Sequence, residues 1–310
     1  MIGPRFLVIL IALTLWLPPV EIVATAHVTD ATPVSIASPI ATPDNLGDLT
    51  AYGITVTLKT ETRQLVGTET IDWHNTTGRP QESLYLRLYP NTAYYGEAEI
   101  TVHNVRVDGV AVTTSAANDP TVLQILLGRI VAPGDRVTIA LDFVTVVPLG
   151  SSGSFWIFQL DPNSGVWTLA DWYPILAGWE PSTGDWYLDR PTTFGDPTFS
   201  ETATYDIGLT APGALKMVGT GDVTDSAPTI GGNVLHTITT GPAREFAMTL
   251  MPDAGSEHEV VQSTRAVKGV ATDANRNLTV RLTLPGSAAI PGLEEAILDA
   301  VTAALPIYAG

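Results

Sequence analysis

The sequence predicts a mainly β fold, a β-sandwich or saddle-like arrangement of sheets, with a short α/β segment at the C-terminal end. Three observations support this class. Apolar and polar residues alternate over most of the chain, which is the period of a half-buried strand. Turn signals containing Gly, Pro and Asn separate the alternating stretches. An apolar pattern with helical spacing is found only near the C-terminus, from Pro291 onward.

Alternation begins at residue 49 and predicts five strand regions in the first half of the chain. The apolar positions that define them are Tyr52 to Leu58, Leu65 to Trp73, Leu84 to Leu88, Val105 to Val112 and Val137 to Phe143. Asp108-Gly109 is a two-residue hairpin signal inside the fourth region. Asn75 to Gly78 and Pro133-Gly134-Asp135 predict further turns. Many short strands with this punctuation are typical of a sandwich or a saddle.

Residues 150 to 200 have a different composition. Five of the seven Trp residues lie between Trp156 and Trp186, interspersed with Gly, Pro and Asp. We predict an ordered irregular loop that these rings hold against the sheet, since a loop of this length needs a core of its own. The alternative is an aromatic surface that binds a sugar or a peptide.

Strands resume beyond residue 200, and one helix follows. The predicted strands are Tyr205 to Leu209, Met217 to Val218, Val234 to Ile238, Phe246 to Leu250, Val260 to Val261, Ala266 to Val270 and Leu278 to Leu284. A helix is expected from Pro291 to Pro306, with Glu294 and Glu295 in its first turn, where the helix dipole favours negative charge. Its predicted apolar face consists of Leu293, Ile297, Ala300, Val301 and Ala304.

The N-terminus has the features of a signal peptide, residues 1 to 26. Arg5 precedes an apolar run from Phe6 to Leu17, and Ala24-Thr25-Ala26 offers a cleavage site. We therefore expect an exported protein, extracellular or at the cell surface; the alternative is an uncleaved N-terminal membrane anchor. Residues 27 to 48, rich in Thr and Pro, predict an extended linker.

Charge and cysteine content exclude several functions. The chain has 15 Lys and Arg against 32 Asp and Glu, a formal net charge of −17. Such a chain cannot neutralise a run of phosphates, so nucleic acid is not an expected partner, and neither is an anionic membrane surface. The sequence contains no Cys, which excludes disulfides, thiolate catalysis and cysteine ligands to a metal.

Several phrases between residues 49 and 255 follow one another in an order that resembles a known family. They are Leu65-x-Gly67-x-Glu69-x-Ile71-x-x-x-Asn75, Leu86 to Asn91, Ala132 to Gly134, Asp171 to Pro174, Gly195 to Ser200 and Ala243 to Ala247. Together they resemble the non-catalytic N-terminal domain of the zinc aminopeptidases typified by membrane alanyl aminopeptidase and leukotriene hydrolase. The sequence departs from that pattern at Trp172, in place of Arg, and at Ser200, in place of Lys.

The resemblance implies a saddle-like β domain over residues 49 to 255 and makes residues 256 to 310 the start of a truncated catalytic domain. Catalysis in the family needs a helix with H-E-x-x-H, whose two His bind zinc while the Glu activates water. The nearest phrase, from His258, places Gln262 at the second ligand and Arg281 at the third, and its alternation favours a strand. We therefore expect no catalytic residue and no metal ligand here, and zinc only in a full-length relative.

The same resemblance gives Asp171 a candidate role. It implies that the carboxylate contacts the free amino group of a peptide substrate, in a cleft shared with the missing catalytic domain. The alternative is an Asp that caps a turn before Trp172. Two functions remain open at this point. The chain is either the inactive N-terminal part of an exported zinc metallopeptidase, or a secreted non-enzymatic β protein that binds peptide or carbohydrate through its Trp-rich loop.

Overall fold

The computed structural model describes residues 46–116, 119–150, 157–192, 198–252, 261–268, 277–284 and 292–308. The chain divides into two compact units, one of residues 43–255 and one that contains residues 256–310. The predicted signal peptide and nearly all of the predicted linker lie outside the described residues.

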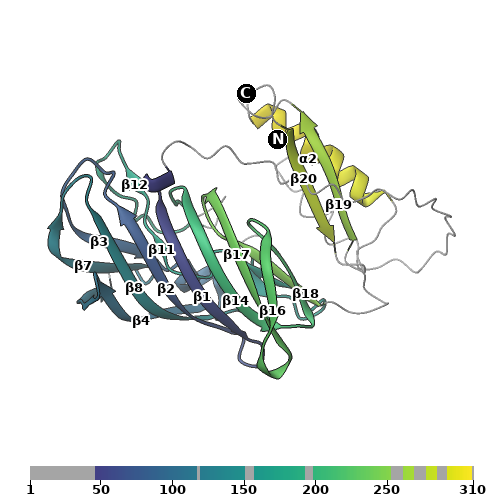
Figure 1. Cartoon of the computed structure of the whole chain (residues 1–310), viewed down its shortest axis with the longest axis horizontal. Helices are drawn as coiled ribbons and strands as arrows, with labels where there is room; N and C mark the ends of the chain where they lie inside the picture. Colours follow the sequence, from purple (N-terminus) through teal and green to yellow (C-terminus); the bar gives the residue numbers. More distant parts are fainter. Residues whose placement is uncertain are drawn as a thin grey trace. The chain divides into compact units, whose positions relative to one another are not determined.

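An eight-stranded sheet is the largest element of the unit 43–255 (Figure 1). Its strand order is β16-β17-β14-β1-β2-β8-β4-β5, and every neighbouring pair is antiparallel except β1 and β14, which run parallel. The strands are β1 (Thr50–Lys59), β2 (Gln64–His74), β4 (Glu99–Val107), β5 (Val110–Ala111), β8 (Arg136–Val146), β14 (Ala203–Pro212), β16 (Val223–Pro228) and β17 (Asn233–Ala243).

Two four-stranded sheets and one two-stranded ribbon complete this unit. One sheet has the order β11-β3-β7-β6, the other β15-β18-β10-β9, and the ribbon pairs β12 with β13. Their bounds are β3 (Gln81–Arg87), β6 (Thr114–Ala116), β7 (Val122–Val131), β9 (Phe158–Leu160), β10 (Trp167–Leu169), β11 (Ile175–Leu176), β12 (Trp179–Glu180), β13 (Asp185–Trp186), β15 (Leu215–Gly219) and β18 (Met248–Pro252). Short 3-10 turns occur at Leu46–Asp48, Tyr89–Asn91, Ala93–Tyr95 and Ile230–Gly232.

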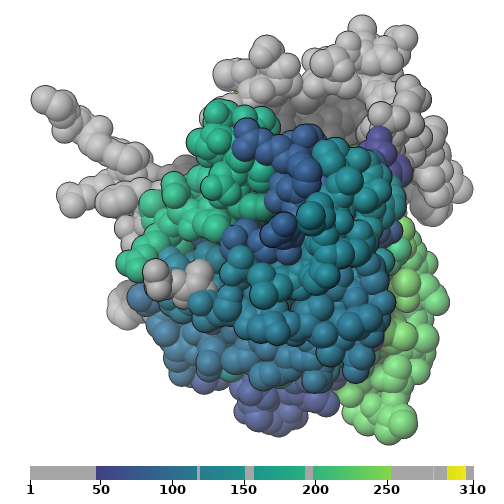
Figure 2. Space-filling model, turned by 90° about the vertical axis from the view of Figure 1, so that its left-hand side faces the viewer, coloured from purple at the N-terminus to yellow at the C-terminus, as the bar shows by residue number. Residues whose placement is uncertain are grey.

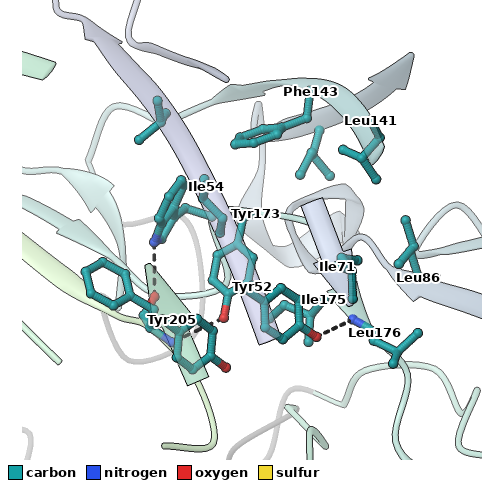
Figure 3. Close-up of a cluster of buried hydrophobic side chains, with 14 of the residues drawn as sticks. Tyr52, Ile54, Ile71, Leu86, Leu141, Phe143, Tyr173, Ile175, Leu176 and Tyr205 are labelled. Carbon is teal, nitrogen blue, oxygen red and sulfur yellow. Dashed lines mark hydrogen bonds between the residues drawn. The ribbon is translucent and has the colours of Figure 1, made fainter. Parts of the chain in front are cut away.

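One core joins the sheets of this unit. On β1 the residues of one parity, Tyr52 to Leu58, are at most 5% exposed, as the alternation predicts. They pack in one cluster with buried side chains of β3, β8, β14 and the segment before β11, which Figure 3 shows around Tyr52, Tyr173 and Tyr205. In the space-filling view the strands of residues 50 to 150, purple to teal, cover most of the visible surface (Figure 2). The mainly β sandwich predicted from the sequence is confirmed.

The predicted hairpin and turns are found where the sequence places them. β4 turns into β5 through Asp108 and Gly109, whose φ angles of 50° and 81° are those of a two-residue hairpin. Gly134, with φ 88°, lies in the turn between β7 and β8. Outside residues 150 to 200, three of the described strands were not predicted: β6, β7 and β16. The run Val122 to Val131 has apolar residues on both parities, so it does not show the period of two.

Between residues 157 and 192 the chain forms more than the irregular loop that was predicted. This region contains five short strands, β9 to β13, and three of them belong to the four-stranded sheets: β11 pairs with β3, β10 pairs with β18, and β9 pairs with β10. The Trp rings lie inside, since Trp167, Trp172 and Trp186 are at most 8% exposed and Trp179 is half-buried. The rings therefore serve as the core of this region, as predicted.

The C-terminal unit contains a hairpin and a helix. β19 (Val261–Lys268) pairs with β20 (Asn277–Leu284), and α2 (Leu293–Tyr308) packs against both strands. The short α/β segment is thereby confirmed, with differences in detail. β19 is continuous where two strands were predicted, and α2 ends at Tyr308, two residues beyond the predicted end at Pro306.

The buried face of α2 also differs from the predicted one. Among the α2 side chains that the structure describes, Leu298 is the most buried at 5%, and it lies outside the predicted apolar face, whereas Ala300 and Val301 are exposed. The face toward the hairpin is thus rotated relative to the expected stripe. No helix within the described ranges is long and apolar enough to cross a membrane.

Candidate functional site

Asp171 lies in the segment between β10 and β11 and is only 1% exposed. Its backbone is in the left-handed region, with φ 56°, a conformation that Asp adopts more readily than most residues. Thr198 donates its hydroxyl to the Asp171 carboxyl, with Oγ1 2.8 Å from Oδ1 and 3.0 Å from Oδ2. The residue therefore sits in a turn and holds together two segments of the chain.

A polar and aromatic cluster surrounds this carboxyl. Tyr89 accepts a hydrogen bond from the Phe199 amide at 3.0 Å, next to Thr198. Burial raises the pKa of Tyr89 to about 12; the nearby Arg87 guanidinium opposes this shift and the Asp171 carboxylate adds to it. Burial, with a smaller contribution from Asp171, also raises the pKa of Tyr94. The phenols consequently stay protonated at neutral pH.

Arg87 is the cation of this cluster, and it is 1% exposed. Its guanidinium donates to the carbonyl oxygens of Tyr187 at 3.0 Å and Asp189 at 2.8 Å, and its Cζ lies 5.0 Å from the centre of the Tyr89 ring. The two hydrogen bonds of Arg87 thus connect the segment after β13 to strand β3. A buried guanidinium that binds backbone carbonyls and stacks on a ring stabilises local structure.

The residues after Asp171 are fixed by three hydrogen bonds. The Trp172 indole donates to the Phe246 carbonyl at 3.1 Å, and Thr145 donates to the Trp172 carbonyl at 2.8 Å. The Phe246 amide donates to the Tyr173 hydroxyl at 3.2 Å. The phrase Asp171 to Pro174 therefore runs through the interior between the sheets.

This geometry brings one carboxyl near two phenols. A carboxyl that is 1% exposed could bind an ammonium group only after the surrounding segments moved. The substrate-contact role of Asp171 stays a prediction, while the turn and the bond to Thr198 give the residue a structural role.

The described residues do not fit a zinc ion. Within the parts of the chain that the structure describes, no group of three His, Asp or Glu side chains could hold a metal. Gln262 lies in β19 and Arg281 in β20, so both positions are in strands, as the alternation predicts. His258 itself lies outside the described residues. His74 and His103 lie in strands β2 and β4, as expected.

Glu69 is a residue of chemical interest that the sequence analysis did not single out. It lies on β2 among buried residues, is 1% exposed, and within the described chain neither of its carboxyl oxygens has a hydrogen-bond partner. Its burial could have been read from the sequence. Glu69 shares its parity with Leu65, Ile71 and Trp73, which predicts that a carboxyl faces the core.

Comparisons with known proteins were made by sequence and by structure. No protein-family model matches the chain, and no curated protein sequence matches it. Solved structures do: the M1 zinc metallopeptidase from Deinococcus radiodurans matches with a TM-score of 0.50 and a point mutant of it with 0.51, each at 16% identity. The chain shares the fold of the M1 zinc metallopeptidases. This M1 fold agrees with the N-terminal domain expected from the sequence.

The extent of the match limits what it shows. It covers 80% of this chain and 51% of each metallopeptidase, so the chain spans about half the length of the proteins with the M1 fold that it matches. At 16% identity the likeness concerns the fold, because one fold can carry many functions. Function must be argued from the residues of this chain.

Proposed function

We propose that this chain is the N-terminal, non-catalytic part of an exported zinc metallopeptidase of the aminopeptidase type. Residues 43 to 255 would form a rigid β scaffold beside a catalytic domain. That domain, encoded beyond residue 310, would carry the zinc. In this proposal the 310 residues by themselves hydrolyse nothing.

The observation that carries the proposal is the shared fold over 80% of the chain, together with the ordered family phrases. The fold supports a peptidase-related domain. The phrases Leu86 to Asn91 and Asp171 to Pro174, recognised from the sequence, both lie largely in the interior.

The Trp-rich loop gives little support to the alternative of a carbohydrate- or peptide-binding protein. Rings that stack on a sugar must be accessible on one face. Of the four Trp rings that the structure describes between residues 157 and 192, three are buried and the fourth, Trp179, packs edge-on against Trp186 at 5.4 Å. We therefore rank the metallopeptidase proposal first.

Asp171 keeps its proposed role within this function. It would bind the free amino group of a peptide once the catalytic domain completes the cleft and the segments that bury the carboxyl move apart. The carboxyl is the one acidic group of the cluster formed by Arg87, Tyr89, Tyr94 and Thr198. A carboxylate is the group that would bind a substrate ammonium.

The coding DNA beyond codon 310 tests the proposal. We expect it to encode H-E-x-x-H on a predicted helix, followed by a further Glu, and the protein made from the extended frame to bind one zinc per chain and hydrolyse aminoacyl anilides. In that protein, Asp171→Asn should raise KM more than it lowers kcat. The 310-residue chain should bind no stoichiometric zinc. A downstream region without the motif, or one zinc per 310-residue chain lost on His258→Ala, would overturn the proposal.

A further inference from the structure

Glu69 is a buried carboxyl group of the core for which the described residues supply no hydrogen-bond partner. On β2 it stands opposite Ile54 of β1 and Leu141 of β8, both at most 2% exposed. Its own exposed fraction is 1%, and within the described residues no donor lies within hydrogen-bond distance of either oxygen. A carboxylate buried without a partner is far more costly than a neutral carboxylic acid in the same place.

The groups that face Glu69 do not offset a negative charge. The titratable groups near it are the buried phenols Tyr52 of β1 and Tyr205 of β14, whose pKa values the Glu69 charge raises further. Tyr173, from the segment before β11, contacts both phenols, with ring centres 5.8 and 6.2 Å away (Figure 3). On β8 the same face presents Ile139, Leu141 and Phe143. Within the described chain, no cation faces the carboxyl.

We propose that Glu69 is a proton-binding group of the core, and that its proton couples the stability of the β domain to pH. In the folded domain the carboxyl is held as the neutral acid, whereas in the unfolded chain it is free to ionise. The domain is then most stable at acidic pH, and its free energy of unfolding falls as the pH rises. This inference goes beyond the proposed function, since it requires no substrate and no zinc.

The direction follows from proton linkage. Burial raises the pKa of Glu69 well above its usual range. Between the unfolded and the folded pKa, the folded state binds more protons than the unfolded state, so raising the pH favours unfolding. The stabilisation is therefore complete below the ordinary Glu pKa and is lost progressively as the pH rises toward the folded pKa. The three phenols remain neutral in this range, because burial raises their pKa values as well.

The test is urea unfolding of the full chain across about pH 5 to pH 8, for the wild type and for Glu69→Gln, which keeps the shape and cannot ionise. The ratio of unfolding constants, wild type over E69Q, should rise with pH by up to about tenfold per unit. Glu82→Gln is the matched control, because Glu82 is an exposed residue of β3. The ratio of unfolding constants, wild type over E82Q, should vary by less than about twofold over this pH range.

A second measurement uses the wild-type protein alone and therefore requires no variant to fold. In wild-type protein with ¹³C-labelled Glu side chains, one carboxyl resonance should titrate at a higher pH than the others, or keep its protonated position to neutral pH. If E69Q does not fold, Glu69→Leu takes its place in the unfolding series. A wild-type to variant ratio that is constant with pH, or Glu carboxyls that all titrate together in the ordinary range, would overturn the proposal.

Discussion

Thr198 donates one hydroxyl to both oxygens of Asp171, at 2.8 and 3.0 Å, across 27 positions of sequence. The bond joins the turn after β10 to the segment that leads into β14. Asp171 is 1% exposed, so water cannot easily replace the hydroxyl. The stability of the region should therefore depend on Thr198 as well as on the apolar core.

Replacing Thr198 by Val removes the donor and keeps the shape. Because a hydrogen bond to a carboxylate contributes about 1.5–3 kcal/mol, Thr198→Val should lower the unfolding free energy by about that amount. Urea unfolding followed by Trp fluorescence measures it. Thr70→Val is the control: Thr70 is exposed on β2, and its replacement should change stability by less than about 0.5 kcal/mol. Equal losses in the two variants would contradict the structural role assigned to the Asp171 bond.

Trp172 should be the Trp residue of the Trp-rich region that tolerates substitution least. It is fully buried, and its indole donates to the Phe246 carbonyl at 3.1 Å. Trp172→Phe leaves that carbonyl unpaired, which costs about 1–3 kcal/mol before any loss of packing. Trp179→Phe is the matched change at a half-buried ring, and it should cost less than about 1 kcal/mol. A larger loss from W179F than from W172F in thermal unfolding would show that the indole bond is unimportant.

The hairpin at Asp108-Gly109 gives a test of backbone conformation. Gly109 has φ 81°, and an added Cβ would meet no atom within 4 Å, so Gly109→Ala is strained only through its backbone. The expected cost is roughly 1–2 kcal/mol. Gly53→Ala is the control, since Gly53 lies in β1 without a positive φ and also in open space; this change should be neutral or slightly stabilising. If both variants melt at the wild-type temperature, the left-handed turn is not required.

Much of the fold follows from sequence periodicity, and the exceptions have physical causes. β1 and β2 are half-buried strands, so their period of two identifies both the strand and its buried face. β7 has apolar residues on both parities, and β16 is exposed on both faces, so neither shows alternation. The face of α2 depends on the neighbouring hairpin, which a helical pattern alone does not specify.

The sequence predicts less about the candidate site than about the fold. The position of Asp171 could be assigned through the family phrase, but its bond to Thr198 joins segments that no local pattern connects. The opposite is true of Glu69. Its parity with Leu65 and Ile71 predicts burial, and the absence of partners follows only from the sheets that pack around it. Sequence thus identifies which side chains are buried, and tertiary packing determines what they contact.

The final prediction concerns the C-terminal unit. The core cluster runs from Tyr52 to Leu250, entirely within residues 43 to 255, and the hairpin β19–β20 with α2 belongs to a separate compact unit. Deleting residues 256 to 310 should therefore leave the melting temperature of the β domain nearly unchanged. The deletion should also improve solubility, because Val301 presents an apolar side chain that is 36% exposed, and a 16-residue helix is marginal in water by itself.

Melting curves of the full and the shortened chain, each followed by near-ultraviolet circular dichroism of the Trp residues, decide the matter. Six of the seven Trp residues, all except Trp16, lie within residues 43–255, so the signal reports mainly on that unit. If the full and the shortened chain melt at the same temperature, the β domain folds independently of residues 256 to 310. A drop of several degrees in the shortened chain, with loss of the single cooperative transition, would mean that residues 256 to 310 complete the core of the β domain. In that case the boundary near residue 255 is not a domain boundary.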